Sequence, residues 1–245
     1  MKEKIYQNYR SANSSKKNIK RNSHIKSLFF QFDKNFSSFL PNEKTIKIVD
    51  IGCGGGELVA WLNKRGYKNT SGYDLSQEQI NIAKETFEID VYCEDILSPE
   101  IKFPEADIYF LRDVLEHFDK RSIEILFNSL KKTNSRDIKL IVQTLNGATP
   151  TGIVNFYSDI THENCFTERS ITQLFSSNFN TTIKFKSWYA YGTSISSRIK
   201  VSISKVLIML RKIIYGLEIG HGNKIYTANI ISEIKINFGE ENGWI

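Results

Sequence analysis

The sequence predicts an α/β fold, in which a mainly parallel β-sheet carries helices on both faces and ends in an antiparallel pair of strands. Short apolar runs alternate with amphipathic helical segments between residues 46 and 146. That alternation is typical of a parallel sheet with crossover helices. Two later segments alternate in hydrophobicity and are separated by a long helical segment, as expected for strands at the edge of such a sheet.

The first part of the chain supplies five predicted strands and the helices between them. A helix over 27–40, ending at Pro41, comes before the first strand. Ser76 is a predicted N-cap, because Glu78 and Gln79 follow it in the first turn of a helical segment. The expected strands are 46–52, 69–74, 89–93, 106–113 and 138–146, and the helices between them are 55–66, 76–87 and 120–133.

The second part of the chain departs from this alternation. Residues 147–166 are predicted to form a long irregular connection, and such a connection inside a domain is usually functional. A helix capped by Thr167 is expected over 167–178. The predicted edge strands are 181–191 and 224–236, with a basic amphipathic helical insertion over 195–215 between them.

Charge is unevenly distributed along the 245 residues, whose net charge is +6. Residues 1–26 and 184–224 each contain eight Lys or Arg and a single Glu, so the rest of the chain is acidic. Two basic flanks favour phosphate groups, an anionic substrate or an anionic membrane face as partners. A solvated, lysine-rich surface would give the same distribution.

Cysteine spacing and the lack of long apolar runs bear on the compartment. The three cysteines, Cys53, Cys93 and Cys165, show neither a disulfide framework nor metal-ligand spacing, which favours a reducing cytosol. The N-terminus lacks the apolar stretch of a signal peptide, and no run of about 18 apolar residues occurs. We therefore expect a cytoplasmic protein without a metal.

A glycine-rich loop follows the first predicted strand in the string VDIGCGGGEL. Its glycines at 52, 54 and 56 come after Asp50, and Glu57 stands where a dinucleotide-binding G-x-G-x-x-G loop has its third glycine. The spacing is therefore G-x-G-x-G. It resembles motif I of the class I methyltransferases that use S-adenosylmethionine (SAM), a cofactor with no pyrophosphate to place on a helix N-terminus.

Acidic residues at the ends of later strands fit the same resemblance. Asp74 ends the second strand, where a carboxylate can accept hydrogen bonds from both ribose hydroxyls, and Asp95 ends the third, near an adenine amino group. The resemblance implies a Rossmann-like class I methyltransferase fold with a seven-stranded sheet, SAM as cofactor and S-adenosylhomocysteine (SAH) as product. The cofactor-binding residues that it implies are Asp50, Gly52, Cys53, Gly54, Gly56, Asp74, Leu75, Asp95, Ile96 and Arg112.

The string YSDITHENCFTERSITQLF resembles a subgroup of bacterial methyltransferases found with capsule, lipopolysaccharide and O-antigen biosynthesis. That resemblance implies O-methylation of a sugar, or of a sugar-linked group, on a nucleotide or lipid carrier. We expect a methyltransferase domain over 41–245 with a substrate loop at 147–166. A basic arm and helix over 1–40 would precede it and could close as a lid.

A sugar hydroxyl is a weak nucleophile, so we expect a general base near the reactive methyl group. His162 in the predicted loop and His117 after the fourth strand are the leading catalytic candidates, and Asp113 is a further one. Asp159 and Glu163 could orient His162 or bind sugar hydroxyls, or Asp159 could simply cap a turn. A histidine after the fourth strand could equally order a helix or form a wall of the SAM pocket.

The N-terminal arm carries candidates of its own. An arginine from the arm, Arg10 or Arg21, could reach the SAM carboxylate, with Tyr6 and Tyr9 on the same lid, or the arm could simply be solvated. His24 has no supporting neighbours in the sequence and would lie over the site only if the arm closed.

An apolar stripe runs along the predicted helical insertion, opposite basic residues. Such a stripe could pack against its own domain or a second copy, lie on the inner membrane face, or contribute to substrate recognition. The stripe comprises Ile199, Ile203, Val206, Leu207, Leu210 and Ile214, opposite Lys200, Lys205, Arg211 and Lys212.

Three other functions share parts of this pattern. A nucleic-acid methyltransferase would suit the positive charge, but RDVLEH stands where amino-group methylases of bases carry N/D-P-P-Y/F, so no nucleic-acid partner is expected. A subunit of this fold without catalysis would not need the glycines and acids of the cofactor site. A quinone- or lipid-type small-molecule methyltransferase would look much alike before residue 147, and it is the main alternative.

Overall fold

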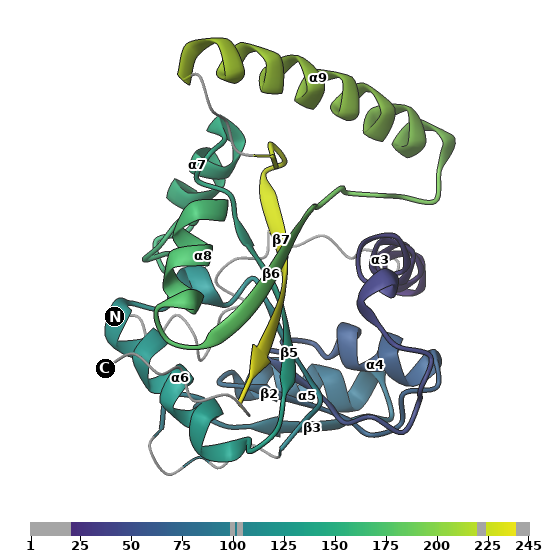
Figure 1. Cartoon of the computed structure of the whole chain (residues 1–245). Helices are drawn as coiled ribbons and strands as arrows, with labels where there is room; N and C mark the ends of the chain where they lie inside the picture. The colour runs from purple at the N-terminus through teal and green to yellow at the C-terminus, as the bar shows by residue number, and fades with distance from the viewer. Residues whose placement is uncertain (1–20, 99–100, 102–104, 220–223, 239–245) are drawn as a thin grey trace, which may run out of the picture.

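A single twisted sheet of seven strands organises residues 21–98, 101, 105–219 and 224–238, which the computed structural model describes (Figure 1). The strand order is β3-β2-β1-β4-β5-β7-β6. Neighbouring strands from β3 to β5 are parallel, whereas β7 is antiparallel to β5 and β6. The strands are β1 (Ile48–Ile51), β2 (Thr70–Asp74), β3 (Asp90–Cys93), β4 (Ile108–Arg112), β5 (Ile138–Leu145), β6 (Asn180–Ser187) and β7 (Asn229–Asn237).

Helices cover both faces of this sheet, which confirms the predicted α/β fold class (Figure 1). The α-helices are α3 (Arg21–Asn35), α4 (Glu57–Lys64), α5 (Gln77–Thr86), α6 (Lys120–Thr133), α7 (Pro150–Tyr157), α8 (Glu168–Ser176) and α9 (Ile195–Ile219). Two short 3-10 helices are η1 (Ser37–Phe39) and η2 (Leu115–His117). Ser76 caps α5 as predicted, since its hydroxyl accepts from the Gln79 amide.

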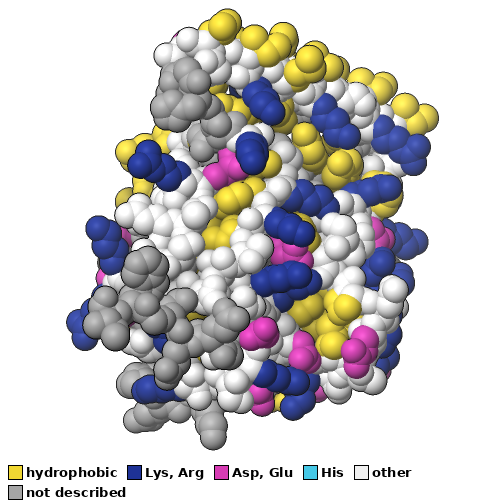
Figure 2. Space-filling view, in the orientation of Figure 1, with side chains coloured by type: hydrophobic (Ala, Val, Ile, Leu, Met, Phe, Trp, Pro, Cys, Tyr) yellow, Lys and Arg dark blue, Asp and Glu magenta, His cyan; other side chains and the backbone are white. Residues whose placement is uncertain are grey.

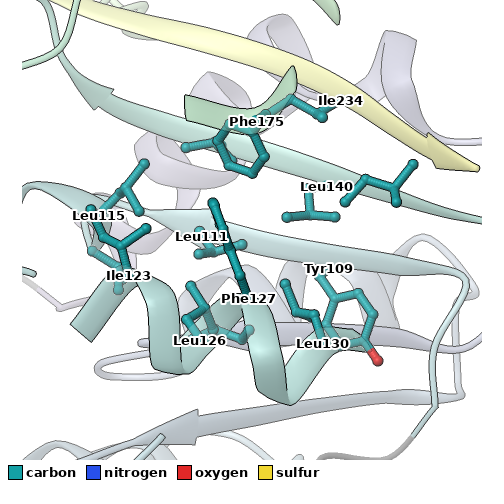
Figure 3. Close-up of a cluster of buried hydrophobic side chains, with 14 of the residues drawn as sticks. Tyr109, Leu111, Leu115, Ile123, Leu126, Phe127, Leu130, Leu140, Phe175 and Ile234 are labelled. Atoms are coloured by element: carbon teal, nitrogen blue, oxygen red, sulfur yellow. The ribbon is translucent and has the colours of Figure 1, made fainter. Parts of the chain in front are cut away.

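Alternate residues of β4 enter two separate cores, one on each face of the sheet. Ile108 and Phe110 belong to the cluster under α3 and α4, whereas Tyr109 and Leu111 pack against α6 and α8. Figure 3 shows the second cluster, with Phe127 of α6 at its centre. Because both faces of β4 are covered, its sequence is a continuous apolar run.

The carboxyl ends of the parallel strands meet at one edge of the sheet, hereafter the carboxyl edge. The strand order reverses between β1 and β4, and open α/β sheets bind ligands outside the carboxyl ends at such a point. The glycine-rich loop, η2 and the connection after β5 all begin at this edge. The fold therefore gathers the predicted site residues there.

Helix α3 begins and ends earlier than the sequence pattern predicts. The helix expected over 27–40 is observed as Arg21–Asn35, followed by η1. The Lys186 ammonium donates to the Asn35 carbonyl at 2.8 Å, and the Asn35 side-chain amide donates to the Tyr189 carbonyl at 2.9 Å. These contacts with β6 and the residues after it satisfy the end of the helix. A tertiary contact therefore ends it before the proline.

The prediction that 147–166 is irregular is wrong in its middle, where α7 forms. The Thr149 hydroxyl accepts from the Gly152 amide at 3.0 Å, and Pro150 occupies the first turn. Proline suits this position because its missing N–H would have no partner inside the helix. The threonine–proline pair was thus a helix-start signal within the segment.

Both predicted edge strands are shorter than 181–191 and 224–236. Strand β6 ends at Ser187, and the amide of the next residue donates to Thr227 Oγ1 at 3.3 Å. Strand β7 begins only at Asn229. The chain therefore leaves the sheet earlier than the alternation of the sequence indicates.

Helix α9 is the predicted insertion 195–215, and it extends across one end of the molecule, beyond β6 and β7 (Figure 1). Of the alternatives for its apolar stripe, packing against its own domain is wrong. Ile203 and Leu210 on this stripe are 55% and 50% exposed. Among the described residues, no helix combines the length and apolar character needed to cross a bilayer.

Candidate active site

The glycine-rich loop between β1 and α4 is left-handed at three positions. Gly52, Gly54 and Gly56 have φ angles of 72°, 53° and 75°, which glycine adopts without strain. A Cβ on Gly52 would lie 2.2 Å from a methyl group of Val114, and one on Gly56 would lie 2.5 Å from Ile89 Cδ1. Two of the three glycines are therefore required by close packing as well as by backbone conformation.

Gly54 differs from its neighbours because it faces open space. Apart from Gly54 itself and its two neighbours in the chain, no atom of the described residues lies within 4 Å of the point that a Gly54 Cβ would occupy. The Gly54 amide donates to Asp74 Oδ2 at 2.8 Å, and the Ser76 amide donates to Asp74 Oδ1 at 2.8 Å. A carboxylate oxygen can accept two hydrogen bonds, so Asp74 keeps capacity for two more donors. Together, Gly54 and Asp74 form a cradle that fits a ribose.

Asp50 lies at the end of β1 and is 1% exposed. Neither of its carboxylate oxygens has a hydrogen-bond partner among the described residues. Burial raises the pKa of Asp50 to about 7, although the nearby Arg112 guanidinium acts in the opposite direction. A buried carboxylate without a partner is costly, so a cationic group of a ligand would stabilise it.

Arg112 and Asp113 follow each other at the end of β4. Arg112 Nη1 lies 3.5 Å from Asp113 Oδ2, and its guanidinium lies over the Phe32 ring of α3 at 5.4 Å. Asp113 has a φ of 56°, and strain of this kind is common at functional sites. Its Oδ1 accepts from Gln143 Nε2 at 2.8 Å and from Asn229 Nδ2 at 3.1 Å. These bonds to β5 and β7 suit a positioning role better than proton transfer.

The other predicted cofactor contacts differ in what they can offer. Asp95 Oδ1 accepts from the Leu97 amide at 2.9 Å, so this carboxylate caps its own turn and retains further lone pairs. Leu75 is 43% exposed beside Asp74, as a contact to a ligand ring requires. The side chains of Cys53 and Ile96 are buried in the core, so only the backbone of these two residues is available to a cofactor.

The two histidines predicted as base candidates meet at the carboxyl edge. Their ring centroids are 4.7 Å apart, with the ring planes inclined at 46°. His117 belongs to η2, four residues after Asp113, whereas His162 follows α7. The ring of Phe156 stacks on that of His162 with centroids 6.0 Å apart. The fold therefore joins one histidine from each half of the chain.

Hydrogen bonds assign the same tautomer to both imidazoles. His162 Nδ1 lies 2.9 Å from the Phe156 carbonyl oxygen, which can only accept, so Nδ1 carries the proton. The Thr161 hydroxyl donates its single proton to Asp159 Oδ1 at 2.6 Å. The same hydroxyl lies 3.0 Å from His117 Nδ1 and has no second proton, so it accepts a hydrogen bond from a protonated Nδ1. Each imidazole then carries its lone pair on Nε2, the form that a general base needs.

This arrangement changes the predicted role of Asp159. One predicted role of Asp159 was to orient His162, but the structure links Asp159 to His117 through the Thr161 hydroxyl. The alternative that Asp159 caps a turn is confirmed, since its Oδ1 accepts from the Thr161 amide at 2.9 Å. At His162 Nδ1, the partner is a backbone carbonyl of α7 and not an acid. Asp159 and Thr161 of the D-x-T-H string therefore orient His117 and not the histidine within the string, which a sequence pattern does not reveal.

Glu116 is a site residue that the sequence patterns missed. It is 1% exposed, and its Oε2 accepts from the Thr144 hydroxyl at 2.9 Å. Burial, followed by the charge of Asp113, raises the pKa of Glu116 to about 8. Its carbonyl accepts from the amides of Glu163 at 2.7 Å and Asn164 at 3.0 Å. Glu116 therefore connects the segment after α7 to η2. The sequence signal that could have indicated its burial is an acid placed directly after the apolar pair Val-Leu.

His24 has the neighbours that the sequence did not indicate. It lines a small hollow with Gly55 and Glu57, beside the glycine-rich loop. Helix α3 begins at Arg21, the arginine expected on the lid. The other candidates from the arm lie outside the described residues: Tyr6, Tyr9 and Arg10. Within the described ranges, no three His, Cys, Asp or Glu side chains are grouped to hold a metal ion.

A family model for a methyltransferase domain matches residues 24–182, which is more than half of the chain. The chain belongs to the methyltransferase domain family. The match runs from α3 into β6, so it includes the glycine-rich loop, Asp74 and both candidate histidines. The prediction that this methyltransferase domain is an enzyme of the methyltransferase class is thereby confirmed.

One curated relative of the methyltransferase domain is the mitochondrial ubiquinone biosynthesis O-methyltransferase of Saccharomyces cerevisiae. The two are 30% identical over 122 residues, which are 47% of this chain and 39% of the yeast protein. The chain thus spans about two fifths of the length of that relative.

Solved structures of methyltransferases share the fold at low identity. A SAM-dependent methyltransferase from Archaeoglobus fulgidus matches with a TM-score of 0.61 and 15% identity, over 86% of this chain and 93% of that one. The magnesium protoporphyrin IX methyltransferase of Synechocystis PCC 6803, with bound SAM, gives a TM-score of 0.54 and 13% identity. That match covers 96% of this chain and 97% of the other. These likenesses confirm the predicted Rossmann-like methyltransferase fold.

Proposed function

We propose that this methyltransferase domain uses SAM to methylate a hydroxyl oxygen of a small molecule, with the His117–His162 pair supplying the general base. One observation carries the proposal. Both imidazoles have Nδ1 occupied and Nε2 as acceptor, and they lie at the edge of the sheet where the glycine-rich loop also begins. A base and a cofactor cradle at one edge suit methyl transfer to oxygen.

The cofactor half of the site fits SAM at three points. Asp74 would accept from the ribose hydroxyls, and the open backbone at Gly54 would lie against the cofactor. The unpaired Asp50 carboxylate would compensate the positive charge of the methionine amino group. Bound SAM supplies an electrophilic methyl group, so the protein has to align the acceptor and exclude water.

His162 is our candidate for the base that touches the acceptor. It is half-buried, and it belongs to the segment 147–166, which we propose forms the wall of the acceptor site. Its Nε2 would take the proton of the acceptor hydroxyl, a step that contributes about 10²–10⁴-fold in rate. His117, fixed by Thr161 and Asp159, would be the alternative base, because the acceptor hydroxyl can donate its single proton to only one Nε2.

For the acceptor we propose a sugar hydroxyl on a nucleotide or lipid carrier. The resemblance of the string around DITHE to capsule and O-antigen methyltransferases supports this class. The histidine pair supports it too, because a sugar hydroxyl is a very weak acid and depends on a base. The second candidate is a phenolic precursor of a quinone, which the similarity to the yeast ubiquinone O-methyltransferase favours.

Calorimetric titration with SAH tests the cofactor half first. We expect micromolar binding by the wild-type chain and a loss of roughly 10- to 100-fold in Asp74→Asn, which keeps the shape but not the charge of the carboxylate. Asp90→Asn, an exposed change at the start of β3, is the matched control and should bind normally. Failure of the wild-type chain to bind SAH would overturn the proposal.

Transfer of a labelled methyl group from SAM tests the acceptor. Nucleotide sugars, lipid-linked sugars and catechol-type quinone precursors are offered in parallel. Methylation of a sugar that His162→Asn lowers by at least 100-fold supports the sugar assignment. Methylation of the catechol alone would replace it with the quinone-type function.

A further inference from the structure

The outward side of α9 is apolar along its whole length. Ten apolar side chains there are between 50% and 82% exposed, and together they occupy about half of the helix circumference. Figure 2 shows hydrophobic side chains along the rim at the top, with Lys and Arg beside them. The ten residues form the outer apolar face: Ile195, Ile199, Ile203, Val206, Leu207, Met209, Leu210, Ile213, Ile214 and Leu217.

Contacts on the opposite side of α9 set its orientation. Val201 is 8% exposed, and the Tyr215 ring stacks on Tyr226 with centroids 5.5 Å apart. Lys205 Nζ lies 5.3 Å from the ring centroid of Tyr189. Both halves of the helix are thus attached to the segments that connect it to the sheet. The outer apolar face therefore points away from the domain.

Cations line both borders of the outer apolar face. A helix turns by about 100° per residue, so residues seven apart lie on nearly the same side. Basic residues separated by a multiple of seven therefore follow one border of the face, and two further basic residues follow the other. The sequence of α9 contains a single acid, in its last turn. The border cations are Arg198 and Lys212 on one side, and Lys200 and Arg211 on the other. Lys205 lies over the Tyr189 ring and is not counted among them.

We infer that α9 docks the domain on an anionic phospholipid membrane, with the helix lying in the plane of the interface. The outer apolar face would enter the acyl-chain boundary, and the border cations would reach the lipid phosphates. The helix has 25 residues, roughly 37 Å, with cations along most of its length. A membrane-spanning orientation would bury those charges, whereas an in-plane one leaves them at the headgroups.

Charge also decides between a membrane and a second copy of the chain. If the outer apolar faces of two copies met, the border cations of both would lie across the same interface, with one acid from each α9 to offset them. Like charges opposed in this way are unfavourable. An anionic lipid surface instead attracts every border cation.

Docking through α9 turns the carboxyl edge of the sheet towards the membrane. Strand β6 ends at Ser187, opposite Ile230 of β7, so α9 is inserted at the edge where the candidate histidines lie. Helix α7 begins at the same edge and exposes Val154 and Tyr157, which are 64% and 81% accessible. The apolar surface of this edge is therefore not confined to α9.

Co-sedimentation of the full chain with vesicles tests the docking surface. No SAM or acceptor is present, so the result does not depend on the proposed methylation. We expect the chain to pellet with vesicles of phosphatidylcholine and phosphatidylglycerol, and to remain in solution with phosphatidylcholine alone. High salt should weaken the binding, because it screens the border cations.

Two variants separate the charged and apolar parts of the surface. Arg198→Gln/Lys200→Gln/Lys212→Gln removes three border cations and should lower the partition coefficient by roughly 100-fold. Ile203→Asn/Leu210→Asn changes two side chains that are already half exposed, so the fold is retained, and binding should fall at least tenfold.

Lys68→Gln/Lys84→Gln/Lys132→Gln is the matched control. It removes the same charge from exposed lysines at the other edge of the sheet and should pellet like the wild type. The proposal is overturned if the wild-type chain ignores anionic vesicles, or if all variants bind equally. It is also overturned if the chain alone sediments at twice its 28.3 kDa mass and the Ile203→Asn/Leu210→Asn variant becomes monomeric.

Discussion

The imidazole rings of His117 and His162 lie 4.7 Å apart, centroid to centroid, and each ring is held at Nδ1 by a different partner. Thr161 serves His117, and a backbone carbonyl serves His162. Each imidazole then carries its lone pair on Nε2. A hydroxyl has one proton to donate, so one of the two rings can act as its base without moving.

Loss of the His162 imidazole should lower the rate of methyl transfer and leave cofactor binding intact. We expect His162→Asn to lower kcat by about 10²–10⁴-fold, because the general base is lost. SAH affinity, measured by calorimetry, should stay within about twofold of the wild type. A normal kcat in this variant would show that another group takes the proton, and His117→Asn would be the next variant to assay.

The Thr161 hydroxyl should matter through His117 alone. Thr161→Val removes the hydrogen bond to His117 Nδ1 and the one to Asp159 Oδ1. We expect kcat to fall roughly tenfold, the value of about one hydrogen bond, with a shifted pH profile because the tautomer of His117 is no longer fixed. Thr161→Ser keeps the hydroxyl and should restore activity. Equal losses in both variants would indicate a packing role.

Alanine at two glycines of the loop should separate cofactor binding from folding. Gly54→Ala places a methyl group into open space at a φ of 53°, so the chain should lose about 1–2 kcal/mol of stability and most of its SAH affinity. Gly52→Ala would set a Cβ 2.2 Å from Val114, and the chain should unfold or aggregate. Thermal melts with and without SAH distinguish the two effects. An unchanged SAH affinity in Gly54→Ala would refute the cradle.

Asp50 should make the protein less stable as pH rises. Its pKa is about 7 in the folded chain, against 3.8 for an ordinary aspartate, so the folded state binds an extra proton between these pH values. Stability is then lost from pH 4 to pH 7, by roughly 4 kcal/mol. Asp50→Asn cannot ionise and so avoids this loss of stability. The variant should be more stable than the wild type at pH 8, with little difference at pH 4.

Urea denaturation of both chains at the two pH values checks this prediction. The quantity to compare is the difference in unfolding free energy between the two chains. Glu116 also has a raised pKa, so it lowers the stability of both chains as pH rises. Added SAH should stabilise the wild type more than Asp50→Asn, because the cofactor amino group compensates the carboxylate. A constant difference between the two chains across pH would contradict the raised pKa.

The parallel half of the sheet could be predicted from the sequence because local pattern and fold agree there. The run around Ile48 is apolar on both faces of β1, and the amphipathic segment after Ser76 has its cap in the sequence. The end of α3 could not be predicted. It depends on Lys186 and Tyr189, which are far away in the chain and become neighbours only after folding.

The residue types of the candidate site were predictable from the sequence, but the hydrogen bonds between them were not. His117, His162 and Asp159 could be named from motif position alone. That Thr161 connects two of them, and that the carbonyl of buried Glu116 holds the segment after α7, depends on how η2 packs against that segment. Hydrogen bonds between elements distant in sequence leave no periodic signal.

Because Ser187 and Ile230 are paired, the chain leaves and re-enters the sheet at adjacent points, about 5 Å apart. The residues between them form one long connection between β6 and β7, whereas a turn of about two to five residues is enough to join two antiparallel strands. Evolution can thus acquire, exchange or lose helix α9 without altering the register of the sheet, as long as Tyr189 and residues 225–229, which contact α3, Asn146 and Asp113, are kept. The same junction offers protein engineers a place to remove the helix, or to graft it onto another enzyme of this fold.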